Sequence, residues 1–320
     1  MIALDEIRRA REVIRGLAVR TPLVRLDADT DAEIWLKLEL LQPVRSFKLR
    51  GAASAVLQAT EADLAGGVLT ASAGNMAQGL AYVARLRGLP ATIVVPDHAP
   101  QTKIDAIERY GGRVIKVTYD EWWQTLTSGR FDDAGSAGAG AKPLFVHPVA
   151  DERVMAGNGT IGLELLEQLD GFDAVVVPYG GGGLVTGIAS AVKAERPDVR
   201  FFSAEPSTGA PVAATLAAGT PTAVEYTPSF VDGSGSRELI PSVWAHASEL
   251  LEGGFAVPVD EVADAVRLLA ERTRVVAEGA GALALAAALA HDVGRKVVCV
   301  VSGGNIDPAV FARILVGETP

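Results

Sequence analysis

The residues with the clearest chemical potential are four consecutive glycines: Gly180, Gly181, Gly182 and Gly183. The apolar run before them predicts a strand, and a helix is expected from Leu184. Glycines let the backbone turn with its N–H groups pointing inward, and the helix adds its positive N-terminal end. The spacing matches neither GxGxxG nor GxxxxGK[ST], which argues against a dinucleotide or a P-loop nucleotide. The run therefore predicts a phosphate site, because a simple strand–helix turn rarely needs four glycines.

A second pattern that could bind an anion follows the apolar residues 67–70. Ser72, Gly74 and Asn75 precede a helical pattern that begins near Met76. Ser and Asn are ordinary N-cap residues, so these residues alone favour helix capping. The same groups could instead donate to a small carboxylate held at the helix N-terminus.

A lysine and a serine also follow apolar strands. Lys48 lies in SFKLRGA; a lone lysine is usually a solvated charge, and the neighbouring Arg45 and Arg50 favour that interpretation. A buried lysine, however, has a lowered pKa and can form a Schiff base. Ser302 ends the last apolar run, where open α/β sheets hold their ligands, although another turn would explain it equally well.

The composition narrows the class of protein. A chain of 320 residues suggests two domains, and 49% apolar with 21% charged residues indicates a large core without long disorder. The net charge of −10 disfavours a nucleic-acid or anionic-membrane partner. The single cysteine, Cys299, excludes an internal disulfide and a cysteine cluster for zinc. We therefore expect a cytoplasmic globular protein.

The sequence contains no clear pattern for a metal site or for a membrane span. The chain lacks GxSxG and HExxH, and its histidines lack metal-ligand spacing: His98, His147, His246 and His291. Residues 64–84 and 174–192 carry no charge, but polar residues or glycines interrupt them. Both are interpreted as buried strand–turn–helix units, because such broken backbone could not satisfy its hydrogen bonds in lipid.

Short apolar runs alternate with helical periodicity along most of the chain. Residues 260–272 illustrate a helix, with Val262 and Val266 on one face, and AVVVP (174–178) illustrates a strand covered on both faces. The alternation predicts an α/β fold with parallel sheets. The predicted strands are 34–39, 67–70, 91–95, 113–117, 144–147, 174–178, 199–204, 255–257 and 297–302.

Four motifs occur in an order that is hard to obtain by chance: SFKLRGA (46–52), SAGN (72–75), GGGGL (180–184) and SGGN (302–305). Together they resemble the serine/threonine dehydratase (threonine ammonia-lyase) branch of the fold-type II pyridoxal-phosphate enzymes. Further similar segments extend the resemblance over nearly the whole chain: RTPL at 20–23, residues 95–112, residues 147–168 and EGAGALAL at 278–285.

The resemblance implies an α/β fold of two open, twisted, mostly parallel sheets flanked by helices, similar to the tryptophan synthase β chain. Residues 1–66 and 146–320 would form a large cofactor-binding domain. Residues 67–145 would form a small domain that closes on the substrate. The segment GSAGAGAK (135–142) would be a mobile or boundary segment. The cofactor would lie in the cleft between the domains.

The cofactor implied by the resemblance is pyridoxal 5′-phosphate. Lys48 would form the Schiff base and remove the substrate Cα proton. The turn Gly180–Gly183 would hold the phosphate, and Phe47 would pack on the ring. Asn75 would hydrogen-bond the ring 3-oxygen, and Ser302 would face the ring nitrogen.

Other residues would form the substrate pocket by the same resemblance. The SAGN motif would hold the substrate carboxylate, while Glu278 and the segment Asp232–Gly233 would line the pocket. Glu278 is also expected to contact the cofactor. The expected substrate-binding residues are Ser72, Ala73, Gly74, Asn75, Met76, Asp232 and Gly233.

Three positions depart from the family pattern. Met76 stands where the family usually has His, and the segment 231–236 (VDGSGS) is unusually rich in small polar residues. Relatives that bind a divalent metal use a Glu, a carbonyl and an Asp. Glu205 matches the first ligand, but Pro211 falls where the Asp would be. We therefore predict no metal site.

The resemblance predicts a carbon–oxygen lyase that converts L-threonine or L-serine to a 2-oxo acid and ammonia. Alternatives are a hydroxyaspartate- or phenylserine-like substrate, a serine racemase, a β-replacement enzyme of the cysteine-synthase type, and more remotely a non-catalytic metabolite-binding protein. Ala73 stands where the family's racemases have a proton-donating Ser, which favours elimination. We expect a homodimer or higher homo-oligomer with no nucleic-acid or membrane partner. Because the chain ends soon after SGGN, a separate regulatory region is not expected.

Overall fold

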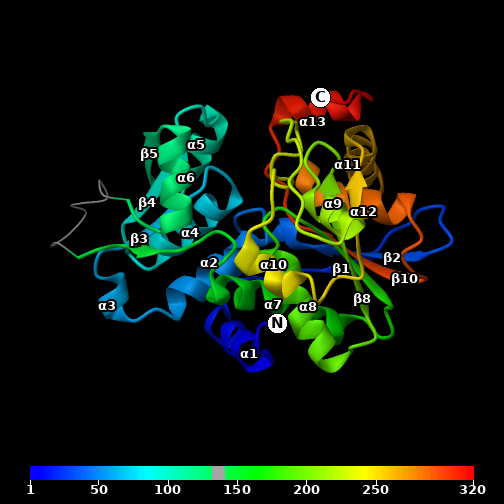
Figure 1. Ribbon diagram of the computed structural model, residues 1–320, viewed down its shortest axis with the longest axis horizontal. Coiled ribbons are helices and arrows are strands. Elements are labelled where there is room, and N and C mark those ends of the chain that lie inside the picture. The colour runs from blue at the N-terminus through cyan, green and yellow to red at the C-terminus, as the bar shows by residue number, and fades with distance from the viewer. Residues whose placement is uncertain (132–140) are drawn as a thin grey trace.

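Two sheets organise the computed structural model, which describes residues 1–131 and 141–320 (Figure 1). The six-stranded sheet has the order β1-β2-β10-β7-β8-β9, and all its pairs are parallel except β1 with β2. Its strands are β1 (Leu23–Arg25), β2 (Glu33–Leu38), β7 (Ala174–Pro178), β8 (Arg200–Pro206), β9 (Gly253–Val257) and β10 (Lys296–Val301). The predicted α/β class is thereby confirmed.

The second sheet is four-stranded and wholly parallel, in the order β5-β4-β3-β6. Its strands are β3 (Val68–Ala71), β4 (Ala91–Pro96), β5 (Arg113–Val117) and β6 (Leu144–Phe145). Each of the nine predicted strands overlaps an observed strand. The short edge strand β1 was not predicted, because three half-buried or exposed residues carry no clear pattern.

Helices cover both sheets. They are α1 (Leu4–Val13), η1 (Glu39–Leu41), α2 (Lys48–Leu57), α3 (Glu61–Leu64), α4 (Asn75–Leu86), α5 (Gln101–Arg109), α6 (Tyr119–Ser128), α7 (Glu152–Gln168), α8 (Gly183–Glu195), α9 (Pro211–Ala218), α10 (Pro241–Ala247), α11 (Val259–Thr273), α12 (Gly279–Ala290) and α13 (Pro308–Leu315). Figure 1 shows α5 and α6 beside the four-stranded sheet, while α1 and α13 lie with the six-stranded sheet.

The central strands β7 and β10 are buried on both faces because their residues alternate between two cores. Val176 and Cys299 pack toward α11 and α12, while Val177 and Val300 pack toward α7 and α8. Runs of β-branched residues without polar alternation are therefore what this sheet requires.

Helix α2 packs against α4 and α7 and contributes to the core of the four-stranded sheet, although it follows β2 of the other sheet. Leu49 and Val56 share a core with Val68 and Ile93 of the four-stranded sheet and with Leu80 of α4. Figure 1 shows α2 between the two sheets, and the first residue of this helix is Lys48.

The segment 135–142 lies mostly outside the described residues, so its predicted role stays a prediction. Across residues 1–131 and 141–320, no helix combines the length and apolar character needed to cross a membrane.

Candidate active site

The end of β10 and the start of α2 meet through backbone contacts. The Phe47 N–H donates to the Ser302 carbonyl oxygen over 3.0 Å, and Ser46 forms an isolated bridge with Gly303. Two motifs that lie far apart in the sequence therefore join, and Lys48 lies one residue from that junction. Ser302 itself is buried, at the carboxyl edge of the sheet where it was predicted.

Lys48 is the most strongly perturbed amine at this junction. Its Nζ donates to the Pro148 carbonyl oxygen over 2.9 Å and lies 5.1 Å from the centre of the Phe47 ring. Burial lowers the pKa of Lys48 to about 8, while the charge of Glu278 opposes the shift. An amine with a pKa near neutrality can act both as a nucleophile and as a proton acceptor.

The segment that follows β6 connects Lys48 to the glycine turn. His147 Nδ1 accepts hydrogen bonds from the backbone N–H groups of Val149, over 3.1 Å, and Ala150, over 2.8 Å. Burial, with the charge of Lys48, lowers the pKa of His147 to about 4, so the ring is neutral at pH 7. The sequence indicated only that His147 lacks metal-ligand spacing, and the structure shows that this ring holds the loop beside Lys48.

The glycine turn between β7 and α8 has a shape that side chains would not allow. Gly182 has a φ of 90°, and a Cβ atom on Gly183 would lie 2.7 Å from the Val149 carbonyl oxygen. A Cβ atom on Gly181 would lie 2.7 Å from the side chain of the same valine. The close approach of Val149 therefore requires glycine here.

The N-terminus of α8 is suited to a phosphate. The first N–H groups of an α-helix have no intrahelical acceptor, and no side chain caps this helix. The hydroxyl of Tyr179, buried without a hydrogen-bond partner among the described residues, lies beneath the turn near Gly182. Free N–H groups, the positive helix end and the glycine cradle fit the phosphate of the predicted cofactor.

The SAGN motif presents a second helix N-terminus. Helix α4 begins at Asn75, and its N-cap residue, Gly74, makes no side-chain cap. The Ser72 hydroxyl accepts from the Gly74 N–H over 3.3 Å, outside the helix. The capping interpretation is therefore wrong, because no side chain occupies the N–H groups of the first turn of α4. Those groups fit a carboxylate.

Asn75 and Glu278 join the two sheets across the site. Asn75 Nδ2 donates to Glu278 Oε1 over 2.7 Å, and the Glu278 N–H donates to the Gly303 carbonyl oxygen. Burial, together with the charge of Asp232, raises the pKa of Glu278 to about 7. Asn75 of SAGN, Glu278 of EGAGALAL and Gly303 of SGGN are thus linked in one hydrogen-bonded cluster.

The predicted substrate residues lie at different depths. Gly233 approaches the glycine turn, since a Cβ atom on Gly180 would lie 3.2 Å from the Gly233 carbonyl oxygen. Asp232 is exposed at the rim and pairs with Lys103 over 2.7 Å. Met76 packs in the core of the four-stranded sheet with only 1% of its surface exposed.

Ala73 and Glu205 complete the placement of the predicted residues. Ala73 is half-buried in the turn before α4. Glu205 is buried, and its carboxylate accepts from the N–H groups of Val212, over 3.0 and 3.2 Å, and Ala213, over 3.1 Å, at the start of α9. Burial raises the pKa of Glu205 to about 7, opposed by these hydrogen bonds. This carboxylate is engaged by a helix end.

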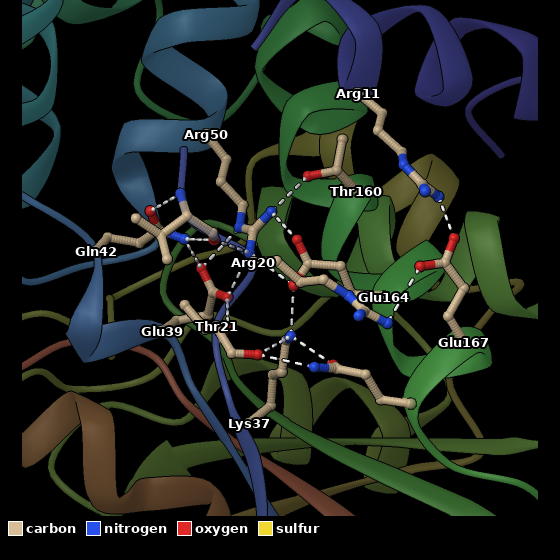
Figure 2. A network of polar contacts seen from close by, with 12 residues as sticks. Arg11, Arg20, Thr21, Lys37, Glu39, Gln42, Arg50, Thr160, Glu164 and Glu167 are labelled. Carbon is tan, nitrogen blue, oxygen red and sulfur yellow. Dashed lines mark hydrogen bonds and ion pairs between the residues drawn. The ribbon is translucent and has the colours of Figure 1, made fainter. Parts of the chain in front are cut away.

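A buried ionic network surrounds Arg50, which lies two residues after Lys48 on α2 (Figure 2). Arg50 donates to Glu39 through Nε and Nη2, each over 2.8 Å, and to Glu164 through Nη1 over 2.7 Å. Lys37 also pairs with Glu164. Only 2% of Arg50 is exposed, so this arginine gives no support to the interpretation of Lys48 as a solvated charge. The network ties α2 to η1 and α7 and so holds the turn that carries Lys48.

A cavity of about 370 Å³ opens beside this network, away from Lys48. Its charged walls include Arg11, Arg20 and Glu167, which pair with one another, and Arg50 and Glu164, which pair within the network. These charged groups are engaged in ion pairs, whereas Lys48 forms none among the described residues, so the chemistry points to the Lys48 cluster instead.

A lysine of lowered pKa, set between two mostly parallel sheets and beside a glycine turn at a helix N-terminus, fits the class of site that binds an aldehyde cofactor carrying a phosphate. The chain belongs to the family described as pyridoxal-phosphate dependent enzyme, whose sequence model matches residues 14–303. Pyridoxal phosphate is accordingly its cofactor.

Individual relatives agree with this assignment. The chain is 39% identical to the L-threonine ammonia-lyase of Thermotoga maritima, over 98% of this chain and 78% of the relative. Its fold matches maize serine racemase with a TM-score of 0.89 at 31% identity, covering 99% and 98% of the two chains. It matches the processed form of threonine deaminase isoform 2 from Solanum lycopersicum with a TM-score of 0.84 at 30% identity, covering 97% of this chain and 87% of that one.

Proposed function

We propose that this protein is a pyridoxal-phosphate-dependent ammonia-lyase that converts L-threonine or L-serine to a 2-oxo acid and ammonia. The observation that carries the proposal is the Lys48 amine, whose pKa is lowered to about 8 where the glycine turn and the SAGN motif converge. The relatives named threonine ammonia-lyase and threonine deaminase support the same reaction.

In this proposal each predicted residue contacts one part of the cofactor. Lys48 binds it covalently, and the turn from Gly180 to Gly183 with the first N–H groups of α8 binds its phosphate. Phe47 packs on the ring, which the proximity of that side chain to Lys48 Nζ supports. Asn75 donates to the ring oxygen, and Ser302 faces the ring nitrogen. When bound, the cofactor withdraws electrons from the Cα atom of the substrate.

The remaining steps belong to the chain's own residues. The N–H groups at the start of α4, with Ser72, Gly74 and Asn75, bind the substrate carboxylate. Lys48 Nζ, neutral in a substantial fraction of molecules near pH 8, removes the Cα proton. The β-hydroxyl then leaves as water, and hydrolysis yields the 2-oxo acid and ammonia. The neutral hydroxyl of Ser302 cannot form an ion pair with the ring nitrogen, which favours prompt elimination.

The larger organisation is also proposed. All four strands of the second sheet fall within residues 68–145, which supports a small domain over residues 67–145 and a large one over 1–66 and 146–320. Helix α2 adds its apolar face to the core of the small domain. We also propose a homodimer or higher homo-oligomer located in the cytoplasm.

The test is 2-oxo acid release from the purified protein over a panel of β-hydroxy amino acids. L-Threonine and L-serine should be the best substrates, with hydroxyaspartate and phenylserine as comparisons. The protein should be yellow, and Lys48→Ala should remove the covalently held colour and the activity together. A protein that binds no pyridoxal phosphate, or releases no 2-oxo acid from the panel, would refute the proposal.

Serine racemase is the second candidate, because the fold matches maize serine racemase with a TM-score of 0.89. Ala73 argues against it, since its methyl group carries no proton to deliver opposite Lys48. L-Serine should therefore give pyruvate much faster than D-serine, and Ala73→Ser should raise the D-serine fraction. D-Serine forming as fast as pyruvate in the unaltered protein would favour the racemase.

A further inference from the structure

Asn305, in the loop after β10, has no role in the function proposed above, yet its side chain is held at both hydrogens. Its Nδ2 donates to the Val44 carbonyl oxygen over 2.9 Å and to Asn75 Oδ1 over 2.7 Å. A backbone carbonyl can only accept a hydrogen bond, so the atom facing Val44 must be the nitrogen. The orientation of the Asn305 amide is therefore set by chemistry.

The orientation of Asn75 follows from that of Asn305. The atom of Asn75 that faces the Asn305 nitrogen must be an acceptor, which is Oδ1. Its Nδ2 then faces Glu278 Oε1 over 2.7 Å, a contact that suits a donor and a carboxyl oxygen. One hydrogen of Asn75 Nδ2 remains for another partner.

We propose that Asn305 is a positioning residue that orients the Asn75 amide, so that a donor rather than an acceptor faces the cofactor. The inference rests on the proposed function, in which Asn75 contacts the ring oxygen of pyridoxal phosphate. Asn305 donates to the oxygen of the Asn75 amide, and Glu278 accepts from its nitrogen. Asn305 and Glu278 both belong to the part of the chain that forms the six-stranded sheet. Asn75 lies at the start of α4, which packs against β3 and β4 of the four-stranded sheet.

The chemical consequence depends on which end of the amide faces the ring oxygen. A donated hydrogen bond stabilises the negative charge that this oxygen carries when deprotonated. A flipped amide would place Oδ1 against that oxygen and against Glu278, which puts like partial charges in contact. A donor at this position should thus keep the oxygen deprotonated and set the absorption spectrum of the bound cofactor.

Two substitutions of Asn305 test whether it sets the orientation of the Asn75 amide or only contacts it. Asn305→Asp keeps the size but removes both donors, so the carboxylate should draw Asn75 Nδ2 toward itself and turn Oδ1 toward Glu278. Asn305→Ala leaves Asn75 loose but still able to donate to Glu278. We expect Asn305→Asp to weaken pyridoxal-phosphate binding about tenfold and shift the absorption band to shorter wavelength, with a smaller effect of Asn305→Ala.

The matched control is Asp307→Ala in the same loop. Asp307 caps α13 by accepting from the Ala309 N–H over 2.8 Å, and within the described residues it makes no hydrogen bond with Asn75. This variant should lower the melting temperature while leaving the absorption spectrum and the dissociation constant of pyridoxal phosphate unchanged. The spectra of all variants are recorded from pH 6 to pH 9 on the cofactor-loaded protein.

The outcomes distinguish this inference from the proposed function. An unchanged spectrum and dissociation constant in both Asn305 variants would overturn the positioning role, while loss of colour in Lys48→Ala would still support the function. An equal shift in Asp307→Ala would overturn it too, because loop stability would then explain the effect. An unaltered protein without bound cofactor would overturn both.

Discussion

Lys48 and Arg50 lie two residues apart on α2, and each belongs to a different buried polar cluster. The two clusters differ in how their charges are paired. Arg50 joins Glu39, Glu164 and Lys37 in a network in which two positive charges face two negative charges (Figure 2). Lys48 has only the Pro148 carbonyl oxygen as its hydrogen-bond partner among the described residues. The two side chains leave the same helical turn, yet one is neutralised by its surroundings and the other is not.

The pKa directions express this difference. Burial opposes ionisation of Glu39, but the charge and hydrogen bonds of Arg50 outweigh it, and the pKa of Glu39 is lowered. In the other cluster burial prevails, lowering the pKa of Lys48 to about 8 and raising that of Glu278 to about 7. Burial also lowers the pKa of Lys37 despite its pair with Glu164, so the contrast with Lys48 rests on Arg50 and Glu39, whose pairing outweighs burial.

The largest expected effect is on turnover when Lys48 is replaced. Lys48→Arg keeps a positive charge, but a guanidinium stays protonated and can be neither nucleophile nor base. We expect 2-oxo acid release to fall by about a thousandfold or more. Lys48→Ala should lower the free energy of unfolding by no more than about 2 kcal/mol, because only one hydrogen bond to a carbonyl is lost. Retained activity in Lys48→Arg would contradict the assignment.

The ionic network should show the opposite pattern. Arg50→Met leaves Glu39 and Glu164 buried without their main partner, which should cost about 3–5 kcal/mol of unfolding free energy. Denaturant titration of the cofactor-loaded protein measures this cost. The control is Arg15→Met, which breaks an exposed pair with Glu12 and should cost about 1 kcal/mol or less. If Arg50→Met and Arg15→Met lowered the unfolding free energy equally, the Arg50 network would not be a structural cluster.

Cofactor loading should depend on pH through the Lys48 amine. Only the neutral amine attacks an aldehyde, and its fraction rises as pH approaches the lowered pKa of about 8. The rate at which cofactor-free protein combines with pyridoxal phosphate should therefore rise about tenfold per pH unit below 8, then level off. Stopped-flow absorbance between pH 6 and pH 10 measures this. A rate that keeps rising toward pH 10 would mean that burial does not lower the pKa.

The smallest effects concern the rim of the site. The charge of Asp232 raises the pKa of Glu278, whereas that of Lys103 lowers it. Asp232→Asn should therefore lower the pKa of Glu278, and Lys103→Met should raise it. Infrared difference spectra of the carboxyl band across pH would follow the titration. Shifts in the same direction would show that breaking the Lys103–Asp232 pair, and not charge, controls Glu278.

Local patterns were enough to predict most of the strands and the glycine turn between β7 and α8. Apolar runs such as 174–178 identify covered strands because a buried parallel strand needs no alternation. The four glycines predict the turn because the backbone there allows no Cβ atoms. The edge strand β1 was not predicted, because its pairing depends on β2 and its own residues show no strand pattern.

Only the tertiary structure decided which polar groups are paired. Arg50 is as polar in sequence as Arg45, yet Arg50 meets carboxylates from residues 39 and 164 and is buried. The caps expected at SAGN are absent, and Asn75 instead contacts Asn305, 230 residues away. Sequence determines residue types and local periodicity, but partners so far apart are brought together only by the packing of the two sheets, which thereby sets burial, pairing and pKa.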